Sequence, residues 1–159
     1  PALALGMARS PAGALPVRTV EPPPQVYFAT LNLTVLRDVI CHLESRPLKR
    51  PEAAHNKNRN GTVDLGACQI NTDTLVHLGY LSDGWRRDAR KDPSKIFTLA
   101  GSQEIAMEVL FAAAARVTWH NWRLNAYNVV YLYACGVNSR PSVTGSCHES
   151  TMRVIRALK

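Results

Sequence analysis

The stretch that decides the fold runs from Cys41 to Asn71 and reads CHLESRPLKRPEAAHNKNRNGTVDLGACQIN. It starts at the end of an apolar helix pattern, continues through a polar, turn-rich excursion, and finishes in the segment DLGACQIN. The dipeptide Asn60-Gly61 is typical of a tight turn, because both residue types tolerate positive φ angles. We therefore expect a small β-hairpin directly after the helix, and a chain that folds back toward the helix end.

The helix that precedes this excursion is predicted to start near Thr34 and to end at Glu44 or Ser45. Pro47 stops it, because the residue before a proline avoids the α region. The predicted buried stripe consists of Val35, Leu36, Val39, Ile40 and Leu43. At 100° per residue, Glu44 falls about 40° beyond Ile40, at the edge of that stripe. Its carboxyl is therefore expected to lie against apolar walls with one side open.

The rest of the chain predicts a mainly helical domain. A short helix is expected from Thr72 or Asp73 to Leu78, and Gly79 closes it. A charged, loop-like segment is expected at about 81–96. Three longer helices are expected at about 102–116, 119–133 and 149–158. Together with the hairpin, these elements give an α+β class that is mainly α.

Length and composition are those of one ordinary globular domain. The chain has 159 residues, of which 46% are hydrophobic and 19% charged, and this is enough to bury one core. No apolar run reaches the length of a membrane span. The net charge of +7 favours an acidic partner. Basic and acidic residues alternate around 83–92, and no nucleic-acid-binding motif accompanies them, so nucleic acid is not expected as a partner.

The first 25 residues differ in composition from the rest. PALALGMA at the start is apolar, and Ala12-Gly13-Ala14 has the A-x-A form of a signal-peptidase site. Pro22-Pro23-Pro24 disfavours regular structure. We interpret residues 1–25 as a disordered signal-peptide remnant and Pro-rich linker, and residues 26–159 as the domain. The alternative for the first segment is an Ala/Pro-rich disordered leader.

The four cysteines, Cys41, Cys68, Cys135 and Cys147, lack C-x-x-C spacing, and the histidines show no ligand spacing. Neither a metal site nor a cofactor is therefore expected. An even number of cysteines fits disulfides in an oxidising compartment. Cys135 and Cys147 flank the loop GVNSRPSVTGS and are expected to pair. Three connectivities are possible in principle, and free buried thiols are the alternative.

Glu44-Ser45 and the later segment 64–71 together resemble the SLT-type lytic transglycosylase family, relatives of goose-type lysozyme. In that family a helix-terminal Glu-Ser precedes a turn and an Asp-x-Gly-x-Met-Gln-Ile-Asn segment. Ala126-Tyr127-Asn128 resembles the third family motif, Ala-Tyr-Asn followed by a small residue and Gly. Residues 91–96 loosely fit an Asp-Pro-x-x-Asn-Ile region. The resemblance covers about residues 31–131.

The resemblance implies a lysozyme-like fold and an exported, periplasmic enzyme that cleaves the MurNAc-GlcNAc β-1,4 bond of peptidoglycan. Glu44 would protonate the glycosidic oxygen. As a carboxylate it would then deprotonate the muramic acid 6-hydroxyl, which closes a 1,6-anhydro ring. Partial burial would help to keep the carboxyl protonated at working pH.

The resemblance also assigns substrate-side roles. Gln69 and Asn71 would bind sugar or acetamido groups, and Tyr127 would orient Glu44 or the leaving oxygen. The residues alone leave other interpretations open. Gln69 and Asn71 can stabilise the turn, Tyr127 can be a core aromatic, and Ser45 can brace the helix end rather than touch substrate.

Two departures from the family pattern stand out. Cys68 replaces the family's Met, and Val130 stands near the position where the family favours Gly. A Cys41–Cys68 bond would join the catalytic helix to the motif that must approach it.

Within that family, the chain most resembles the small periplasmic members associated with secretion, conjugation and pilus machines. Components of a type III or type IV secretion, conjugation or pilus apparatus are therefore candidate partners. Two other functions remain open. The first is a lysozyme-like hydrolase that uses water, with Asp64 or Asp73 as the second carboxylate. The second is a wall-binding assembly subunit without turnover.

Overall fold

The computed structural model describes residues 31–46, 55–58, 61–84 and 88–159. The predicted leader and linker at 1–25 lie outside the described residues, as do Pro47 and Asn60. In chain order, the elements are α1 (Leu33–Ser45), β1 (His55–Lys57), β2 (Val63–Leu65), β3 (Ile70–Asn71), α2 (Thr72–Leu78), the 3₁₀ helix η2 (Pro93–Phe97), α3 (Leu99–Trp119), α4 (Ala126–Cys135) and α5 (Gly145–Ala157). The predicted class, α+β and mainly α, is confirmed.

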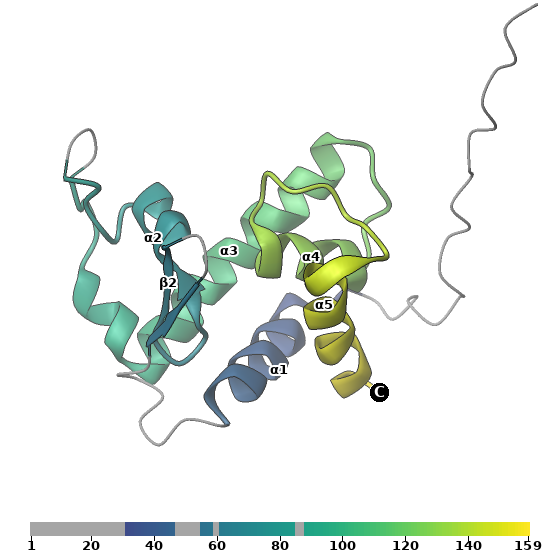
Figure 1. Ribbon diagram of the computed structural model, residues 1–159, viewed down its shortest axis with the longest axis horizontal. Helices are drawn as coiled ribbons and strands as arrows, with labels where there is room; N and C mark the ends of the chain where they lie inside the picture. The colour runs from purple at the N-terminus through teal and green to yellow at the C-terminus, as the bar shows by residue number, and fades with distance from the viewer. Residues whose placement is uncertain (1–30, 47–54, 59–60, 85–87) are drawn as a thin grey trace, which may run out of the picture.

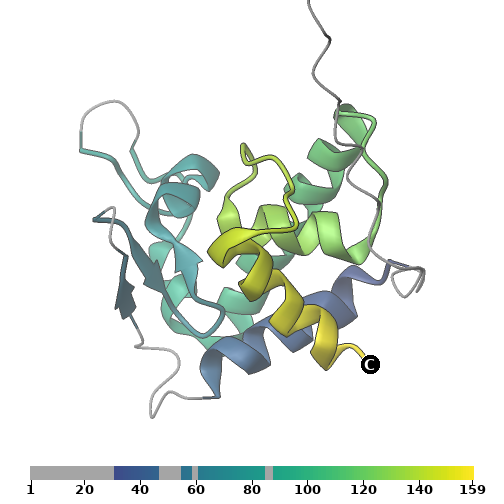
Figure 2. The same cartoon turned by 45° about the vertical axis from the view of Figure 1, so that its right-hand side comes forward.

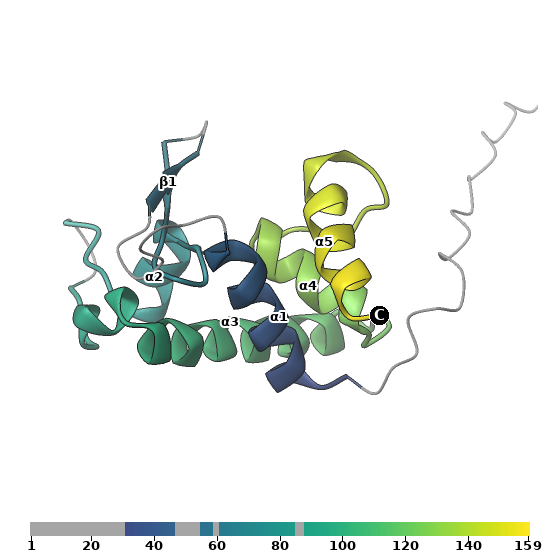
Figure 3. The same ribbon diagram turned by 90° about the horizontal axis from the view of Figure 1, so that it is seen from below.

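Helix α3 is the common support of the described elements. Figure 3 shows it running below two groups, with the strands and α2 over one end and with α4 and α5 over the other. Its first half contributes Ile105, Ala106 and Val109 to one buried hydrophobic cluster. Its second half contributes Leu110, Ala113 and Val117 to the other cluster. One helix therefore fixes the relative position of both groups.

Helix α1 crosses between these two groups. It packs against α3 and α5, with α5 beside it in Figure 1 and crossing in front of it in Figure 2. Its residues Leu36 and Ile40 belong to the α4–α5 cluster, whereas Cys41 belongs to the cluster under the strands. The predicted stripe is confirmed except at Val35, since Val39 and Leu43 are partly buried and also pack against the α4–α5 cluster. Val35 is 46% exposed, because the buried face is rotated toward Cys41.

The start of α1 differs from the prediction in its capping residue. The Asn32 side chain accepts hydrogen bonds from the backbone N–H groups of Thr34 and Val35, at 3.0 and 3.1 Å. Asn32 is the N-cap, and the prediction of Thr34 was wrong. Both residue types favour this position, but the Asn side chain reaches two otherwise unpaired N–H groups. The predicted end at Ser45 is confirmed.

The predicted hairpin is present, and a third strand extends it. The sheet is antiparallel in the order β1-β2-β3, with His55 opposite Leu65 and Asp64 opposite Asn71. At its turn, the Asn58 N–H donates to the Thr62 carbonyl at 2.8 Å. Sequence reasoning missed β3 because it has only two residues, which is too short for an alternation pattern.

Three other helices begin at residues set by side-chain caps, and α5 begins without such a cap. Asn71 rather than Thr72 or Asp73 caps α2, and Gly79 closes this helix as predicted. Thr98 caps α3, which therefore begins at Leu99, and the loop-like segment before it contains η2. Asn125 caps α4, so the predicted helix at 119–133 begins later, at Ala126. Helix α5 begins at Gly145, earlier than the predicted 149.

Gly66 lies where the segment between β2 and β3 meets η2 and α3. Its φ angle is +72°, and a Cβ atom there would overlap the Ile96 carbonyl oxygen and lie 3.0 Å from the Ser102 hydroxyl. That buried hydroxyl accepts the Cys68 N–H at 3.0 Å. The absence of a side chain at Gly66 therefore allows the DLGACQIN segment to lie directly on the helical support.

We expect Gly66→Ala to destabilise the protein by more than about 2 kcal/mol, because backbone strain and steric overlap add. Urea unfolding measures the change. Gly61→Ala is the matched control, since its φ of +86° is similar but no atom lies within 4 Å of the added Cβ. Equal losses for the two variants would contradict the close approach at Gly66.

Candidate active site

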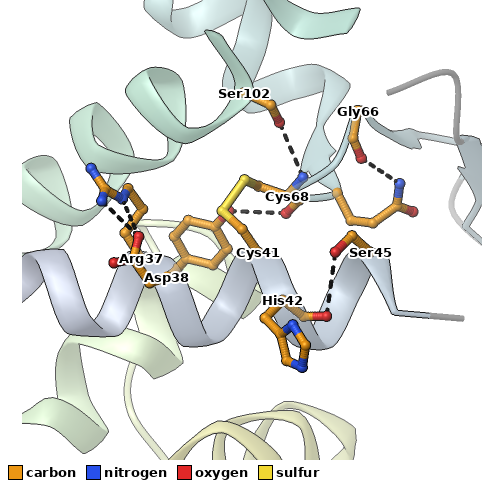
Figure 4. Close-up of a disulfide and its surroundings, with 10 residues drawn as sticks. Arg37, Asp38, Cys41, His42, Ser45, Gly66, Cys68 and Ser102 are labelled. Carbon is orange, nitrogen blue, oxygen red and sulfur yellow. Dashed lines mark hydrogen bonds and ion pairs between the residues drawn. A yellow bond between two sulfur atoms is a disulfide. The ribbon is translucent and has the colours of Figure 1, made fainter. Parts of the chain in front are cut away.

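A disulfide joins the two parts of the candidate site. Cys41 on α1 is bonded to Cys68, with a Cα–Cα distance of 4.1 Å, and the two are 27 positions apart in sequence. Figure 4 shows the bond between α1 and the Cys68 segment, with Ser102 of α3 on the far side of that segment. The suggested pairing is confirmed. Glu44, one turn beyond Cys41, is consequently close to the DLGACQIN segment.

The second disulfide joins the end of α4 to the first turn of α5. Cys135 and Cys147 are bonded with a Cα–Cα distance of 5.8 Å, and the predicted pairing is confirmed. No cysteine is left free. Because α5 packs against α1, this bond also fixes the helix that faces Glu44.

Glu44 is partly buried near the end of α1, and its side chain is 28% exposed. This agrees with the predicted position at the border of the apolar stripe. The Arg153 guanidinium of α5 donates from Nη2 to Glu44 Oε1 and forms an ion pair with it. No local pattern could predict this contact, because the two residues are 109 positions apart in sequence.

Tyr133 is the tyrosine that lies beside this end of α1. Its hydroxyl donates to the Cys68 carbonyl at 3.0 Å, and its ring packs against both hydrophobic clusters. Burial raises the pKa of this hydroxyl, and the negative charges of Glu44 and Asp64 raise it further. Tyr133 therefore stays a protonated donor at working pH, close to both carboxylates.

Tyr133 was not among the predicted site residues, although the residues after it partly resemble the motif that was assigned to Tyr127. In Tyr133-Ala134-Cys135-Gly136, a small residue and Gly follow the tyrosine at the spacing of the third family motif. After Tyr127 the corresponding position is Val130. The two tyrosines are six residues apart on α4, so their side chains point about 120° apart around the helix axis.

Tyr127 lies in the core and is 4% exposed. Its hydroxyl donates to the Ser142 carbonyl, so it must accept from the His148 Nδ1–H, 2.7 Å away. These contacts connect α4 to the following loop and to α5. The interpretation of Tyr127 as a core aromatic is confirmed, and its substrate-side role stays a prediction.

The Gln69 amide lies in the tight turn between β2 and β3. Gln69 has a positive φ of 49°, and its Nε2 donates to the Gly66 carbonyl at 2.8 Å. Ser45 donates to the His42 carbonyl at 3.4 Å, so it braces the end of α1, as its alternative interpretation proposed. Both side chains have clear structural contacts. Their substrate-side roles stay predictions.

Asn71 and Asp64 belong to one hydrogen-bond network on the sheet. Asn71 accepts from the Asp73 N–H and donates to Thr62 Oγ1 and Asp64 Oδ1, at 2.8 and 2.9 Å. Asn58 donates to the same Asp64 oxygen at 2.9 Å. The structural interpretation of both residues is confirmed, although Asp64 binds side-chain amides where backbone groups were expected. The substrate-side role of Asn71 stays a prediction.

The described residues contain no group of three or more His, Cys, Asp or Glu side chains placed to hold a metal ion. Among the described helices, none is both long enough and apolar enough to cross a membrane.

Comparison with protein-family models, with curated proteins and with solved structures found no match.

Replacement of Cys41 and Cys68 together by Ala should lower the free energy of unfolding by about 3.5 kcal/mol on chain entropy alone. The corresponding Cys135 and Cys147 variant should lose about 3 kcal/mol, because it opens a shorter loop. Urea unfolding of both double variants tests the order. Alkylation of the native protein provides a separate check: mass shifts for four free thiols without reductant would contradict both bonds.

Proposed function

We propose that this chain is a peptidoglycan lytic transglycosylase with a lysozyme-like fold and with Glu44 as its catalytic residue. One observation carries the proposal. The Cys41–Cys68 bond joins the helix end that carries Glu44-Ser45 to the segment that carries Gln69. The two motif halves that resemble the family are thus neighbours in space as well as in order.

The reaction needs one carboxyl group that acts twice. Glu44 gives its proton to the glycosidic oxygen, the bond from that oxygen to C1 of the muramic acid breaks, and the GlcNAc end leaves. The 6-hydroxyl oxygen of the same muramic acid then bonds to C1, and the Glu44 carboxylate accepts the hydroxyl proton. No water is consumed. An intramolecular hydroxyl has a high effective concentration, so it can replace water and a second carboxylate.

Tyr133 and Gln69 have suitable supporting positions. The Tyr133 hydroxyl donates its one proton to the Cys68 carbonyl and lies near the charge of Glu44. Its oxygen can accept the hydrogen of the protonated Glu44 carboxyl and so orient that carboxyl. The Gln69 amide nitrogen is bound to Gly66, which points its oxygen in one direction. That oxygen can accept the N–H of an acetamido group, so Gln69 would position the sugar.

A water-using hydrolase is the second candidate, because the charge of Asp64 reaches the same Tyr133 hydroxyl as that of Glu44. Two hydrogen bonds from asparagine side-chain amides to Asp64 Oδ1 hold this carboxylate within the sheet. This favours the mechanism that uses a single carboxyl group. The products separate the two reactions. Transglycosylation leaves 1,6-anhydro ends, whereas hydrolysis leaves reducing ends.

The proposed location is the periplasm. Two disulfides require an oxidising compartment to form and persist. A net charge of +7 favours binding to an acidic wall polymer, and salt would screen that attraction. In such a place the enzyme would open the wall for a secretion, conjugation or pilus apparatus, whose components are the proposed partners.

Glu44→Gln should lower turnover of purified peptidoglycan about 100-fold or more, because it removes the proton donor but keeps the shape. Mass spectrometry of the released muropeptides measures both rate and product, with 1,6-anhydro ends expected from the unmodified protein. Glu149→Gln, an exposed carboxyl on α5, is the control and should keep full activity. If Glu44→Gln were as active as the unmodified protein, Glu44 would not be the catalytic acid.

Tyr133→Phe should lower turnover about tenfold or more, because the orienting hydroxyl is lost while the ring stays in the core. Tyr127→Phe is the matched change on the same helix. It should reduce the free energy of unfolding by about 1 kcal/mol through loss of its hydrogen bonds and leave turnover nearly unchanged. The reverse result would return the role to Tyr127, as the sequence motif predicted.

A further inference from the structure

Helix α5 carries a guanidinium group that lies directly on the candidate catalytic carboxyl. Arg153 Nη2 contacts Glu44 Oε1, and the Arg153 side chain is 54% exposed. A disulfide restrains each of the two helices that carry these residues. The Cys41–Cys68 bond holds α1, and the Cys135–Cys147 bond holds the start of α5.

The contact conflicts with the first step of the proposed reaction. A carboxylate engaged in an ion pair has no proton to give, so Glu44 has to leave Arg153 before it can act as an acid. Ion pairs that are this exposed contribute little net stability, because water and salt screen them. The pair can therefore open readily once another anion is offered to Arg153.

The arrangement of donors indicates which anion would fit. One nitrogen of the guanidinium contacts one oxygen of Glu44, and a guanidinium has further N–H donors in its planar fork. Two parallel N–H groups of this fork match the two oxygens of a carboxylate. A carboxylate on the substrate can thus make a better contact with Arg153 than the present one.

We propose that Arg153 determines substrate specificity by binding a carboxylate that lies beside the scissile bond of the glycan. Binding of this carboxylate releases Glu44 from the ion pair for the proton transfer. The favoured substrate is therefore an acidic glycan, and a neutral β-1,4 N-acetyl glycan leaves the resting ion pair in place. This inference rests on the proposed function.

The test compares two glycans of equal length. Peptide-stripped peptidoglycan strands carry a free lactyl carboxylate, and chitin oligosaccharides have the same linkage without any carboxylate. The unmodified protein should show a higher kcat/KM on the stripped strands. Arg153→Gln should lower kcat/KM on them about tenfold or more and leave chitin cleavage unchanged or raised. Arg153→Lys should restore part of the preference.

Arg156→Gln is the matched control, since it removes the same charge from an exposed position on α5. It should leave the ratio of the two kcat/KM values unchanged. Strands that keep their peptides form a third arm. A preference that depends on Arg153 only when peptides are present assigns the bound carboxylate to the peptide rather than to the lactyl group.

A binding measurement separates this inference from the proposed function. Calorimetry with Glu44→Gln, in which Arg153 has lost its ion-pair partner, should show tighter binding of stripped strands than of chitin oligosaccharides. Adding Arg153→Gln should remove that difference. If the unmodified protein cleaved neither glycan but this pattern held, the proposed function would fail and carboxylate recognition by Arg153 would stand. A preference that Arg153→Gln leaves intact in both turnover and binding would overturn the inference.

Discussion

The Cys41–Cys68 disulfide is the constraint on which the candidate site depends. It crosses from a buried position on α1 to a fully buried position in the segment between β2 and β3. The same segment is held from the other side by Ser102 of α3, which accepts the Cys68 N–H. One covalent bond and one buried hydrogen bond thus set the distance between the end of α1 and the sheet.

Tyr133 connects the region around the Cys41–Cys68 disulfide to both hydrophobic clusters. It comes from α4, packs against both hydrophobic clusters, and donates to the Cys68 carbonyl beside the disulfide. Helix α3 supports both clusters from below, so the halves cannot shift without disturbing one of them. Glu44 lies at the border of this rigid region, where Arg153 can still reach it from the exposed side.

Much of the fold could be read from local patterns. The end of α1, the hairpin, the short helix closed by Gly79 and the mainly helical class followed from residue types that act within a few positions. The predicted start of a helix was wrong where several residues that can act as N-cap lie close together, as at Asn32 and Thr34. The strand β3 was not predicted, because two residues are too few to show a periodic pattern. Glu44 was placed correctly at the edge of an apolar stripe, since helix geometry alone decides that angle.

The sequence by itself determined which residue types could do chemistry: a helix-terminal glutamate, the Gln and Asn of one short motif, and an even set of cysteines. Tertiary structure decided which of them meet. It placed Tyr133 beside Cys68 and directed Tyr127 into the core, and it paired Glu44 with an arginine 109 residues away. The reason is physical. The direction in which a side chain on a helix points in space depends on how that helix packs against its neighbours, and contacts so distant in sequence leave no local pattern to read.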